Sequence, residues 1–291
     1  MDQAEQLRNI IKASSQPHRP LARVITVTSG KGGVGKSNTA INLAIQFRKM
    51  GQRVIILDAD FGLANIEIMF GAVPKHNLCD LIYQGKNIRD IITWGPMEVG
   101  FISGGSGIAG MSNLSRDYLN YIIQNLVELD EMADTIIVDT GAGISDAVLE
   151  FLVASGEILL VTTPEPTSIT DSYSLLKALS RHPRYSVGDT QIKVLANKVF
   201  GEAEAEALYA KLEAVVVRYL KVPITYLGMI PQDTQLAKAV MQQMPVSLDN
   251  PRARSAVAYE AIAAKLMNKE VDAKLTKRGM AAFFSHIISK K

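Results

Sequence analysis

A glycine-rich run between a predicted strand and a predicted helix constrains the fold of this chain more than any other segment. Residues Gly30 to Ser37 read GKGGVGKS and fit the pattern G-x-x-x-x-G-K-[ST] in full. The preceding residues 24–28 (VITVT) have the β-branched composition of a buried strand, and residues 36–50 have the apolar spacing of an amphipathic helix. Such a turn points backbone N–H groups inward at the positive end of a helix, so it predicts a cradle for phosphate groups.

The same run supplies most of the residues that we expect to contact a nucleotide. Lys36 is expected to reach the β- and γ-phosphates, and the Ser37 hydroxyl is a candidate ligand for Mg²⁺. The expected contacts from the loop and the following helical turn are Gly30, Lys31, Gly32, Gly33, Val34, Gly35, Lys36, Ser37 and Asn38.

Short β-branched runs alternate with longer amphipathic segments from residue 22 onward. Strands are predicted at 24–28, 54–58, 100–102, 135–138, 158–162, 191–196 and 224–230. Helices are predicted at 36–50, 116–129, 169–180, 202–219 and 253–269. Alternating strands and helices, with several strands apolar on both faces, predict an α/β fold with a doubly wound, mostly parallel sheet flanked by helices. Because the composition does not shift before about residue 270, we expect one domain over residues 22–270.

Composition excludes several other classes of protein. Hydrophobic residues make up 47% and charged residues 21% of the chain, which rules out global disorder, and the net charge of +2 gives no argument for a nucleic-acid coat. The single cysteine, Cys79, fits a reducing cytosol, and the four histidines have no metal-ligand spacing. The amino terminus is polar, so no signal peptide is predicted. The chain has no run of about 18 apolar residues, so no membrane span is predicted either.

Aspartates follow two of the predicted strands. Asp58 and Asp60 end the run IILDAD, and residues two apart on an extended segment point to the same side. Asp139 ends the apolar run TIIVD and is followed by the small residues TGAG, an arrangement typical of a Walker B aspartate and its switch loop. Asp139 is therefore expected to contact Mg²⁺ through water.

The loop resembles that of the signature-lysine ATPases, which carry a deviant Walker A motif, because Lys31 follows the first glycine in KGGVGKS. The resemblance implies a P-loop NTPase fold like that of MinD and a face-to-face dimer in which Lys31 reaches the phosphates bound by the partner subunit. A cation supplied in this way neutralises charge that develops on the γ-phosphoryl group. The resemblance also implies that Asp60 orients or activates the attacking water and that Asp58 helps to hold Mg²⁺.

Recognition of the base rests on two further positions. Asn197, in the run ANKV, stands where the family places an asparagine amide on adenine, and Pro231 begins a loop that resembles the one flanking the base. GTPases of the N-K-x-D type require an aspartate where this chain has Phe200, so ATP is preferred over GTP. An ordinary turn at the end of a strand is the alternative for the Pro231 segment.

Several stretches resemble the FlhG family of flagellar-number regulators, also called FleN or YlxH, which are relatives of MinD. They are residues 57–65 (LDADFGLAN), 139–145 (DTGAGIS) and 165–173 (EPTSITDSY). The amino terminus, DQAEQLR at 2–8, fits the D-Q-A-x-x-L-R element with which that family docks on the GTPase FlhF and stimulates it. The helical spacing of its apolar residues predicts a short amphipathic helix at 1–13, and the prolines that follow predict a linker at 14–21. The resemblance implies Gln3 and Arg8 as polar effectors and Leu7 as an anchor.

Residues 271–291 are expected to form an amphipathic tail that binds a membrane surface. One apolar stripe is formed by Met280, Phe283, Phe284, Ile287 and Ile288. Basic residues and no acidic residue accompany this stripe from 274 onward, as in helices that lie on anionic lipid. A terminal helix packed on the core has the same pattern and is the alternative.

Together these observations predict an ATP-dependent dimerisation switch that cycles between a cytosolic monomer and a dimer at the inner face of the cell membrane. Its expected cofactors are ATP or ADP and Mg²⁺. Its expected partners are a second copy of the chain, an FlhF-type GTPase, an anionic membrane and a flagellar switch-complex protein or transcription activator, without specific DNA binding. A partition-type ATPase acting on DNA is the main alternative. A third alternative is a redox enzyme on the same fold that holds a metal cluster at its interface. Such an enzyme would need interface cysteines, and Cys79 alone does not suffice.

Overall fold

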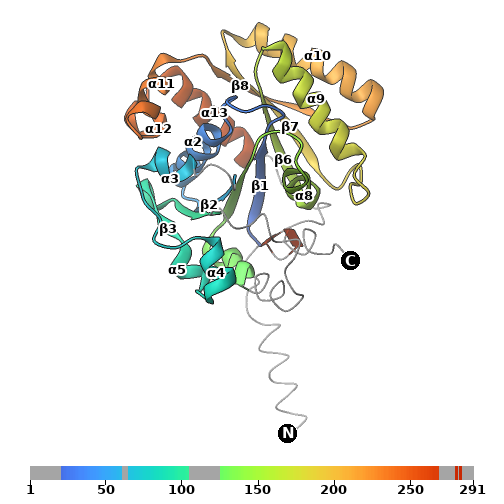
Figure 1. Cartoon of the computed structure of the whole chain (residues 1–291). Coiled ribbons are helices and arrows are strands. Elements are labelled where there is room, and N and C mark those ends of the chain that lie inside the picture. Colours follow the sequence, from blue (N-terminus) through green and yellow to red (C-terminus); the bar gives the residue numbers. More distant parts are fainter. Residues whose placement is uncertain (1–20, 61–64, 105–124, 269–278, 281, 284–291) are drawn as a thin grey trace.

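In the part of the chain that the structure describes, eight strands form one sheet, in the order β3-β4-β2-β5-β1-β6-β7-β8 (Figure 1). The computed structural model describes residues 21–60, 65–104, 125–268, 279–280 and 282–283. The strands are β1 (Arg23–Thr28), β2 (Val54–Ala59), β3 (Thr93–Trp94), β4 (Gly100–Ser103), β5 (Thr135–Thr140), β6 (Glu157–Thr162), β7 (Gln191–Val199) and β8 (Thr225–Pro231). Neighbouring strands run parallel except β3 and β4, which are antiparallel.

The predicted α/β class with a mostly parallel sheet is confirmed, and every predicted strand is present. The sequence patterns missed β3, because a strand of two residues is too short to establish a period of two. They also ended β7 at Ala196, whereas the strand continues to Val199 through an irregular register beside β8.

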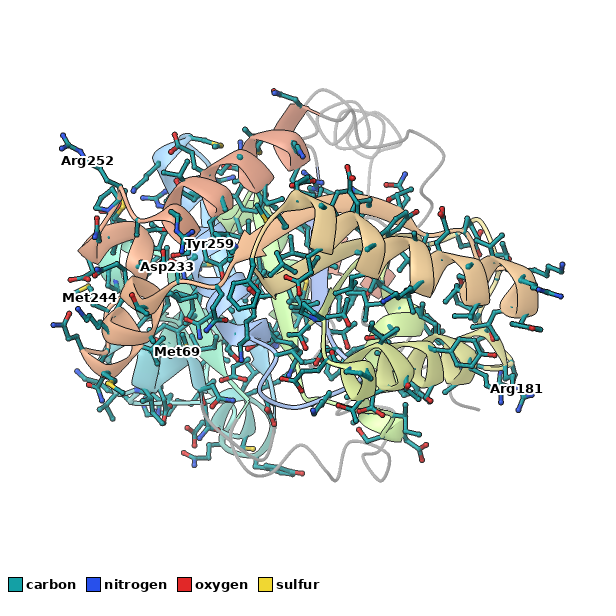
Figure 2. The ribbon with its side chains drawn as sticks, turned by 90° about the horizontal axis from the view of Figure 1, so that it is seen from above. Met69, Arg181, Asp233, Met244, Arg252 and Tyr259 are labelled. Atoms are coloured by element: carbon teal, nitrogen blue, oxygen red, sulfur yellow. The ribbon has the colours of Figure 1, made fainter. Side chains whose placement is uncertain are left out.

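Helices cover both faces of the sheet. One face is covered by α2 (Lys36–Lys49), α3 (Asn65–Phe70), α11 (Thr234–Met241), α12 (Val246–Asp249) and α13 (Arg254–Asn268). The other is covered by α4 (Leu78–Gln84), α5 (Ile88–Ile91), α7 (Leu129–Met132), α8 (Asp146–Ala154), α9 (Pro166–Ser180) and α10 (Glu202–Leu220). A short 3₁₀ turn, Pro96–Glu98, precedes β4. Figure 2, from above, shows α11–α13, with Asp233, Met244 and Tyr259, on the left and α9, which is followed by Arg181, on the right.

Helix predictions at 36–50, 169–180, 202–219 and 253–269 correspond to α2, α9, α10 and α13. The predicted helix 116–129 lies mostly outside the described residues. Among the helices that the structure describes, none has the length and apolar character needed to cross a membrane.

The strands are apolar because both of their faces are buried. Every residue of β2 is buried, and its side chains alternate between two separate clusters. Ile56 packs in the cluster beneath α2 and α13, whereas Ile55 and Leu57 pack in the cluster beneath α4, α7 and α8. Two-sided burial accounts for the continuous apolar runs that predicted a parallel sheet.

β1 lies at the point where the strand order changes direction. It pairs with β5 on one side and with β6 on the other, and Val27 is opposite Asp139 in the register with β5. Ligands of open α/β sheets bind beyond the carboxyl ends of the strands at such a point. The loop that follows β1 therefore occupies the position where this fold places its binding sites.

Part of the carboxyl-terminal segment packs on the core. Met280 and Phe283 are 0% and 2% exposed, and the Met280 backbone N–H donates to both carboxylate oxygens of Asp130 at 3.0 Å. The Phe283 ring stacks on Phe151 of α8, with 5.9 Å between ring centroids. In this conformation the two side chains do not form the open lipid-binding face that the sequence suggested, because α7 and α8 cover them.

The remaining predicted residues of the two ends are not described. Phe284, Ile287 and Ile288 of the tail lie outside the described residues, as do Gln3, Leu7 and Arg8. Any membrane role of Met280 and Phe283 stays a prediction, and it requires the tail to leave α8.

The packing of Phe283 predicts a measurable contribution to stability. Replacing Phe283 with Ala should lower the free energy of unfolding by about 3–5 kcal/mol, because it leaves a cavity beside Phe151. Phe200 is 83% exposed, so Phe200→Ala should change it by less than about 0.5 kcal/mol. Urea unfolding of both variants tests this, and equal effects would contradict the packing.

Candidate functional site

The loop between β1 and α2 has the backbone conformation of an anion cradle. Gly33 and Gly35 have positive φ angles of 75° and 101°, which only glycine adopts without strain. Gly35 is also the N-cap of α2, where no side chain accepts a hydrogen bond from the first turn and no acidic residue is present. The amino end of α2 therefore keeps its N–H groups and its positive potential for an anion.

Two glycines of the loop are required by close approach to neighbouring elements. A Cβ at Gly30 would lie 2.2 Å from the backbone carbonyl of Asp171 on α9. A Cβ at Gly35 would lie 2.4 Å from the side-chain nitrogen of Asn197 at the end of β7. At Gly32, by contrast, a Cβ would have no neighbouring atom within 4 Å. The loop therefore packs against α9 at Gly30 and against β7 at Gly35.

Asp58 and Asp139 are neighbours on β2 and β5. They are opposite each other in the register and are 2% and 0% exposed. The Asp58 carboxylate accepts hydrogen bonds from the N–H groups of Asp60 and Ile66, at 3.1 and 3.4 Å. Neither oxygen of Asp139 has a hydrogen-bond partner of good geometry among the described residues.

Burial decides the protonation of this pair. Burial raises the pKa of Asp139 to about 7, although the Ser37 hydroxyl and the Lys36 ammonium favour its charged form. Burial, and then the charge of Asp139, raise the pKa of Asp58 to about 7. A divalent cation would offset both effects, since it favours the charged carboxylates.

The oxygens of Ser37, Asp139 and Asp58 fit Mg²⁺, which prefers such ligands. In the part of the chain that the structure describes, no three His, Cys, Asp or Glu side chains form a metal cluster. Phosphate oxygens and water would therefore complete the coordination shell, as is usual for Mg²⁺ at phosphate sites.

Asp60 lies at the edge of the same site. Its Oδ2 atom accepts from the side-chain nitrogen of Asn65 at 3.4 Å, and a Cβ at Gly141 would lie 3.6 Å from its Oδ1 atom. The loop that bears Gly141 is joined to the phosphate loop, because the Gly143 N–H donates to the Ser29 carbonyl at 3.0 Å. The predicted Asp60, Asp139 and phosphate loop are therefore brought together.

Lys31 is held by a residue that the sequence patterns did not connect with it. Its Nζ atom donates to Glu165 at 2.6 Å and to the Thr167 hydroxyl at 2.8 Å, at the start of α9. Both charged side chains are partly exposed, and the hydrogen bond from Lys31 lowers the pKa of Glu165. Because exposed ion pairs contribute only about 0–1 kcal/mol, Lys31 is free to exchange Glu165 for another anion.

Asn197 contacts the loop within this structure. Its side-chain nitrogen donates to the Val34 carbonyl at 2.7 Å, and its oxygen accepts from the Lys198 N–H at 2.9 Å. Pro231 ends β8 and is opposite Val199 in the register with β7. Contact of Asn197 and Pro231 with a base stays a prediction.

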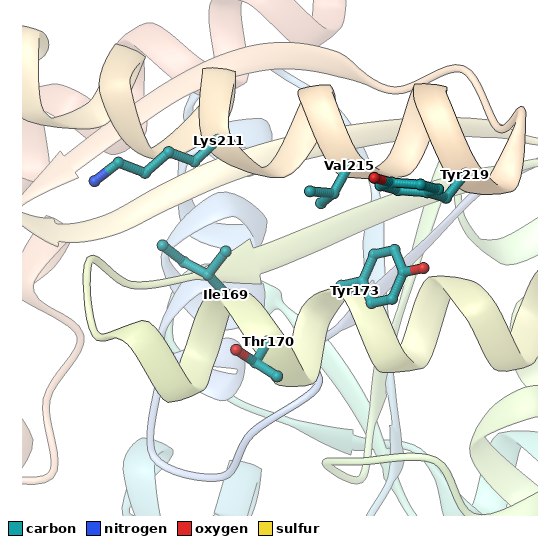
Figure 3. Close-up of a pocket in the computed structure, with 6 residues that line it drawn as sticks. All are labelled: Ile169, Thr170, Tyr173, Lys211, Val215 and Tyr219. Atoms are coloured by element: carbon teal, nitrogen blue, oxygen red, sulfur yellow. The ribbon is translucent and has the colours of Figure 1, made fainter.

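A separate hollow of about 390 Å³ lies between α9 and α10. Its lining residues, drawn in Figure 3, are Ile169, Thr170, Tyr173, Lys211, Val215 and Tyr219. They are mainly apolar and include no carboxylate. The groups capable of phosphate and metal chemistry are gathered at the phosphate loop instead.

Comparison with known proteins agrees with this site. Residues 21–267 match the family model described as "ParA: NUBPL iron-transfer P-loop NTPase". The chain is 41% identical to the antiactivator FleN of Pseudomonas aeruginosa, over 90% of this chain and 91% of that protein. It is 30% identical to the flagellum site-determining protein YlxH of Helicobacter pylori, over 99% and 98% of the two chains.

Among solved structures, the septum site-determining protein MinD of Pyrococcus horikoshii, complexed with Mg-ADP, superposes with a TM-score of 0.68. The match covers 85% of this chain and 97% of that one at 22% identity, which establishes a shared fold. The family match and the two flagellar relatives establish more than the fold, because they extend over most of each chain. The chain belongs to the MinD/ParA family of P-loop ATPases and, within it, to the group of flagellar regulators that includes FleN and YlxH.

Proposed function

We propose that this chain is an ATPase whose ATP-dependent dimerisation regulates the number or placement of flagella. The observation that carries the proposal is Lys31, a lysine of the phosphate loop that is held at the surface by an ion pair with Glu165 and a hydrogen bond to Thr167. The names of the relatives support the biological setting, since one is an antiactivator and the other a flagellum site-determining protein.

In the proposed reaction, the loop and the amino end of α2 hold the phosphates of ATP. Lys36 would neutralise the β- and γ-phosphates, and Ser37, Asp139 and Asp58 would hold Mg²⁺. When bound, Mg²⁺ neutralises charge on the phosphate oxygens. Asp60, at the open edge of the site, orients the attacking water in line with the γ-phosphate.

Lys31 would complete the site of a second copy. It cannot serve the partner's phosphates while it is bonded to Glu165 and Thr167, so dimerisation exchanges these contacts for phosphate oxygens. The exchange costs little, because the broken ion pair is exposed. A cation added in this way stabilises charge on the transferring phosphoryl group.

Membrane attachment would follow release of the tail. Phe283 of the tail packs on Phe151 of α8, and α8 begins immediately after the loop that bears Gly141 and Gly143. Movement of that loop on ATP binding would therefore reach the residues that cover Phe283. Once released, the basic tail would hold the dimer at the inner face of the cytoplasmic membrane through two weak attachments.

The amino-terminal helix would act on a separate partner. We propose that Gln3, Leu7 and Arg8 stimulate an FlhF-type GTPase, on the strength of the DQAEQLR element. A flagellar switch-complex protein or transcription activator is a further proposed partner, and the antiactivator relative supports the second of these.

Substitutions of Lys31 and Asp60 are expected to change the amount of dimer in opposite directions. Lys31→Ala should abolish dimer formation with a non-hydrolysable ATP analogue while ADP binding persists, because the lysine acts on the partner's nucleotide. Asp60→Ala should instead accumulate the ATP-bound dimer and lower turnover by about 100-fold or more. Size-exclusion chromatography with light scattering and phosphate release measure both. A normal dimer formed by Lys31→Ala would contradict the proposal.

Burial of Asp139 predicts a dependence of stability on pH. Its folded pKa is raised to about 7, so its contribution to stability is present below about pH 4, its unfolded value, and is lost as pH rises through 7. Without nucleotide, Asp139→Asn should therefore be more stable than the parent chain at pH 8, by about 2 kcal/mol. Mg-ADP should stabilise the parent more at pH 8 than at pH 6. Urea unfolding of the parent chain and of Asp139→Asn at pH 6 and pH 8 tests this. A difference in stability between the two chains that is the same at both pH values would contradict it.

The amino-terminal proposal is tested by deletion. Removing residues 2–12 should leave the chain's own ATP hydrolysis within about twofold of normal, because the described ATPase site makes no use of them, and should abolish stimulation of FlhF. GTP hydrolysis by FlhF, measured with the intact and shortened chains, decides the matter. Stimulation by the shortened chain would refute the assignment.

A further inference from the structure

Two successive residues of β7 hold two successive carbonyl groups of the phosphate loop. The Lys198 ammonium donates to the Gly33 carbonyl at 2.7 Å, and the Asn197 amide donates to the Val34 carbonyl at 2.7 Å. Asn197 is 1% exposed, whereas Lys198 lies at the surface. β7 and the loop are far apart in sequence, so these bonds form only in the folded chain.

An irregular backbone makes this double contact possible. In a regular strand, side chains of neighbouring residues point to opposite faces, so Asn197 and Lys198 could not both reach one loop. Here the register with β8 shifts between Asn197 and Val199, and Lys198 has a φ of 58°. A side chain other than glycine at such an angle costs on the order of 1 kcal/mol, and strain of this kind is often retained at functional sites. The Asn197 oxygen, which accepts from the Lys198 N–H, stabilises the bend.

The two bonds orient the peptide groups that face the anion. In a planar trans peptide, the C=O and N–H groups point in opposite directions. The peptide with the Gly33 carbonyl carries the Val34 N–H, and the peptide with the Val34 carbonyl carries the Gly35 N–H. Turning both carbonyls toward β7 therefore turns both N–H groups away from it. A hydrogen bond from a charged donor also polarises its peptide, which strengthens the N–H as a donor on the other side.

We propose that Lys198 is a positioning residue which, with Asn197, fixes the phosphate loop in its anion-binding conformation before a nucleotide binds. The inference rests on the proposed nucleotide site and adds to it a residue that acts through the loop. The two hydrogen bonds from Lys198 and Asn197, together called the clasp, act on groups that face the phosphates common to ATP and ADP. The clasp therefore contributes to binding of both nucleotides. It contributes little to the step in which the γ-phosphate is transferred.

The test replaces Lys198 with Met, which removes the ammonium and leaves a side chain of similar length at the same backbone angle. Affinity for fluorescent ADP and for a non-hydrolysable ATP analogue, both with Mg²⁺, should fall by about three- to tenfold and by the same factor for the two. The turnover number at saturating ATP should stay within about twofold of normal. The melting temperature without nucleotide should fall by no more than a few degrees, because one hydrogen bond at the surface contributes only about 1 kcal/mol. Lys198→Arg should restore most of the affinity, because it returns a charged donor.

Lys221 supplies a matched control. It is an exposed lysine with the same φ of 58°, but it caps the end of α10. Lys221→Met should leave both affinities unchanged. Equal binding by the parent chain and Lys198→Met would overturn the proposal, as would a loss confined to the ATP analogue, which would indicate direct contact with the γ-phosphate. If the parent chain bound neither nucleotide, the proposed function would fail and the clasp with it, whereas normal parent binding separates the two results.

Discussion

The packing of the phosphate loop between α9 and β7 is the constraint on which the rest of the site depends. The loop leaves the central strand β1 and passes so close to the α9 backbone that only glycine fits at Gly30. At its other end the Asn197 amide occupies the space where a side chain at Gly35 would lie. A loop held from both sides presents its N–H groups without first being ordered by the ligand, so less conformational entropy is lost when a nucleotide binds.

The charged residues of the site differ in how deeply they are buried. Asp58 and Asp139 are paired by strand register, and burial raises the pKa of each to about 7, so a bound cation would favour their charged forms. Lys31 stands outside this buried pair, in an exposed bond to Glu165. The site thus combines a rigid, buried part that fits phosphate and Mg²⁺ with a surface cation that is readily released. This difference in burial suits a protein in which one group binds nucleotide and another joins two copies.

The repeating features of the fold were predictable from sequence, because they are periodic. Two-sided burial makes the runs before Thr28, Asp58 and Asp139 apolar, and the loop motif locates their shared edge. The contact of Lys31 with Glu165 was not predictable, since it joins residues 134 positions apart and depends on the order of β1 and β6 in the sheet. The bend at Lys198 was hidden as well, because a single residue in an unusual conformation leaves no periodic pattern.

The tail illustrates a different limit. An apolar stripe through Met280 and Phe283 establishes that one side of the segment avoids water, but lipid and a protein core satisfy that requirement equally. In this structure Phe151 and the Asp130 carboxylate cover these residues. The tail therefore has two possible environments, and exchange between them is what a reversible membrane switch requires.

The most direct test of the account measures the mass of the intact chain and its retention on anionic vesicles in the same experiment, with ADP and with a non-hydrolysable ATP analogue. Dimer-dependent membrane attachment predicts a monomer that stays in solution with ADP, and a dimer that is retained on the vesicles with the analogue. A chain that stays monomeric with both nucleotides, or that binds the vesicles equally with both, would contradict it.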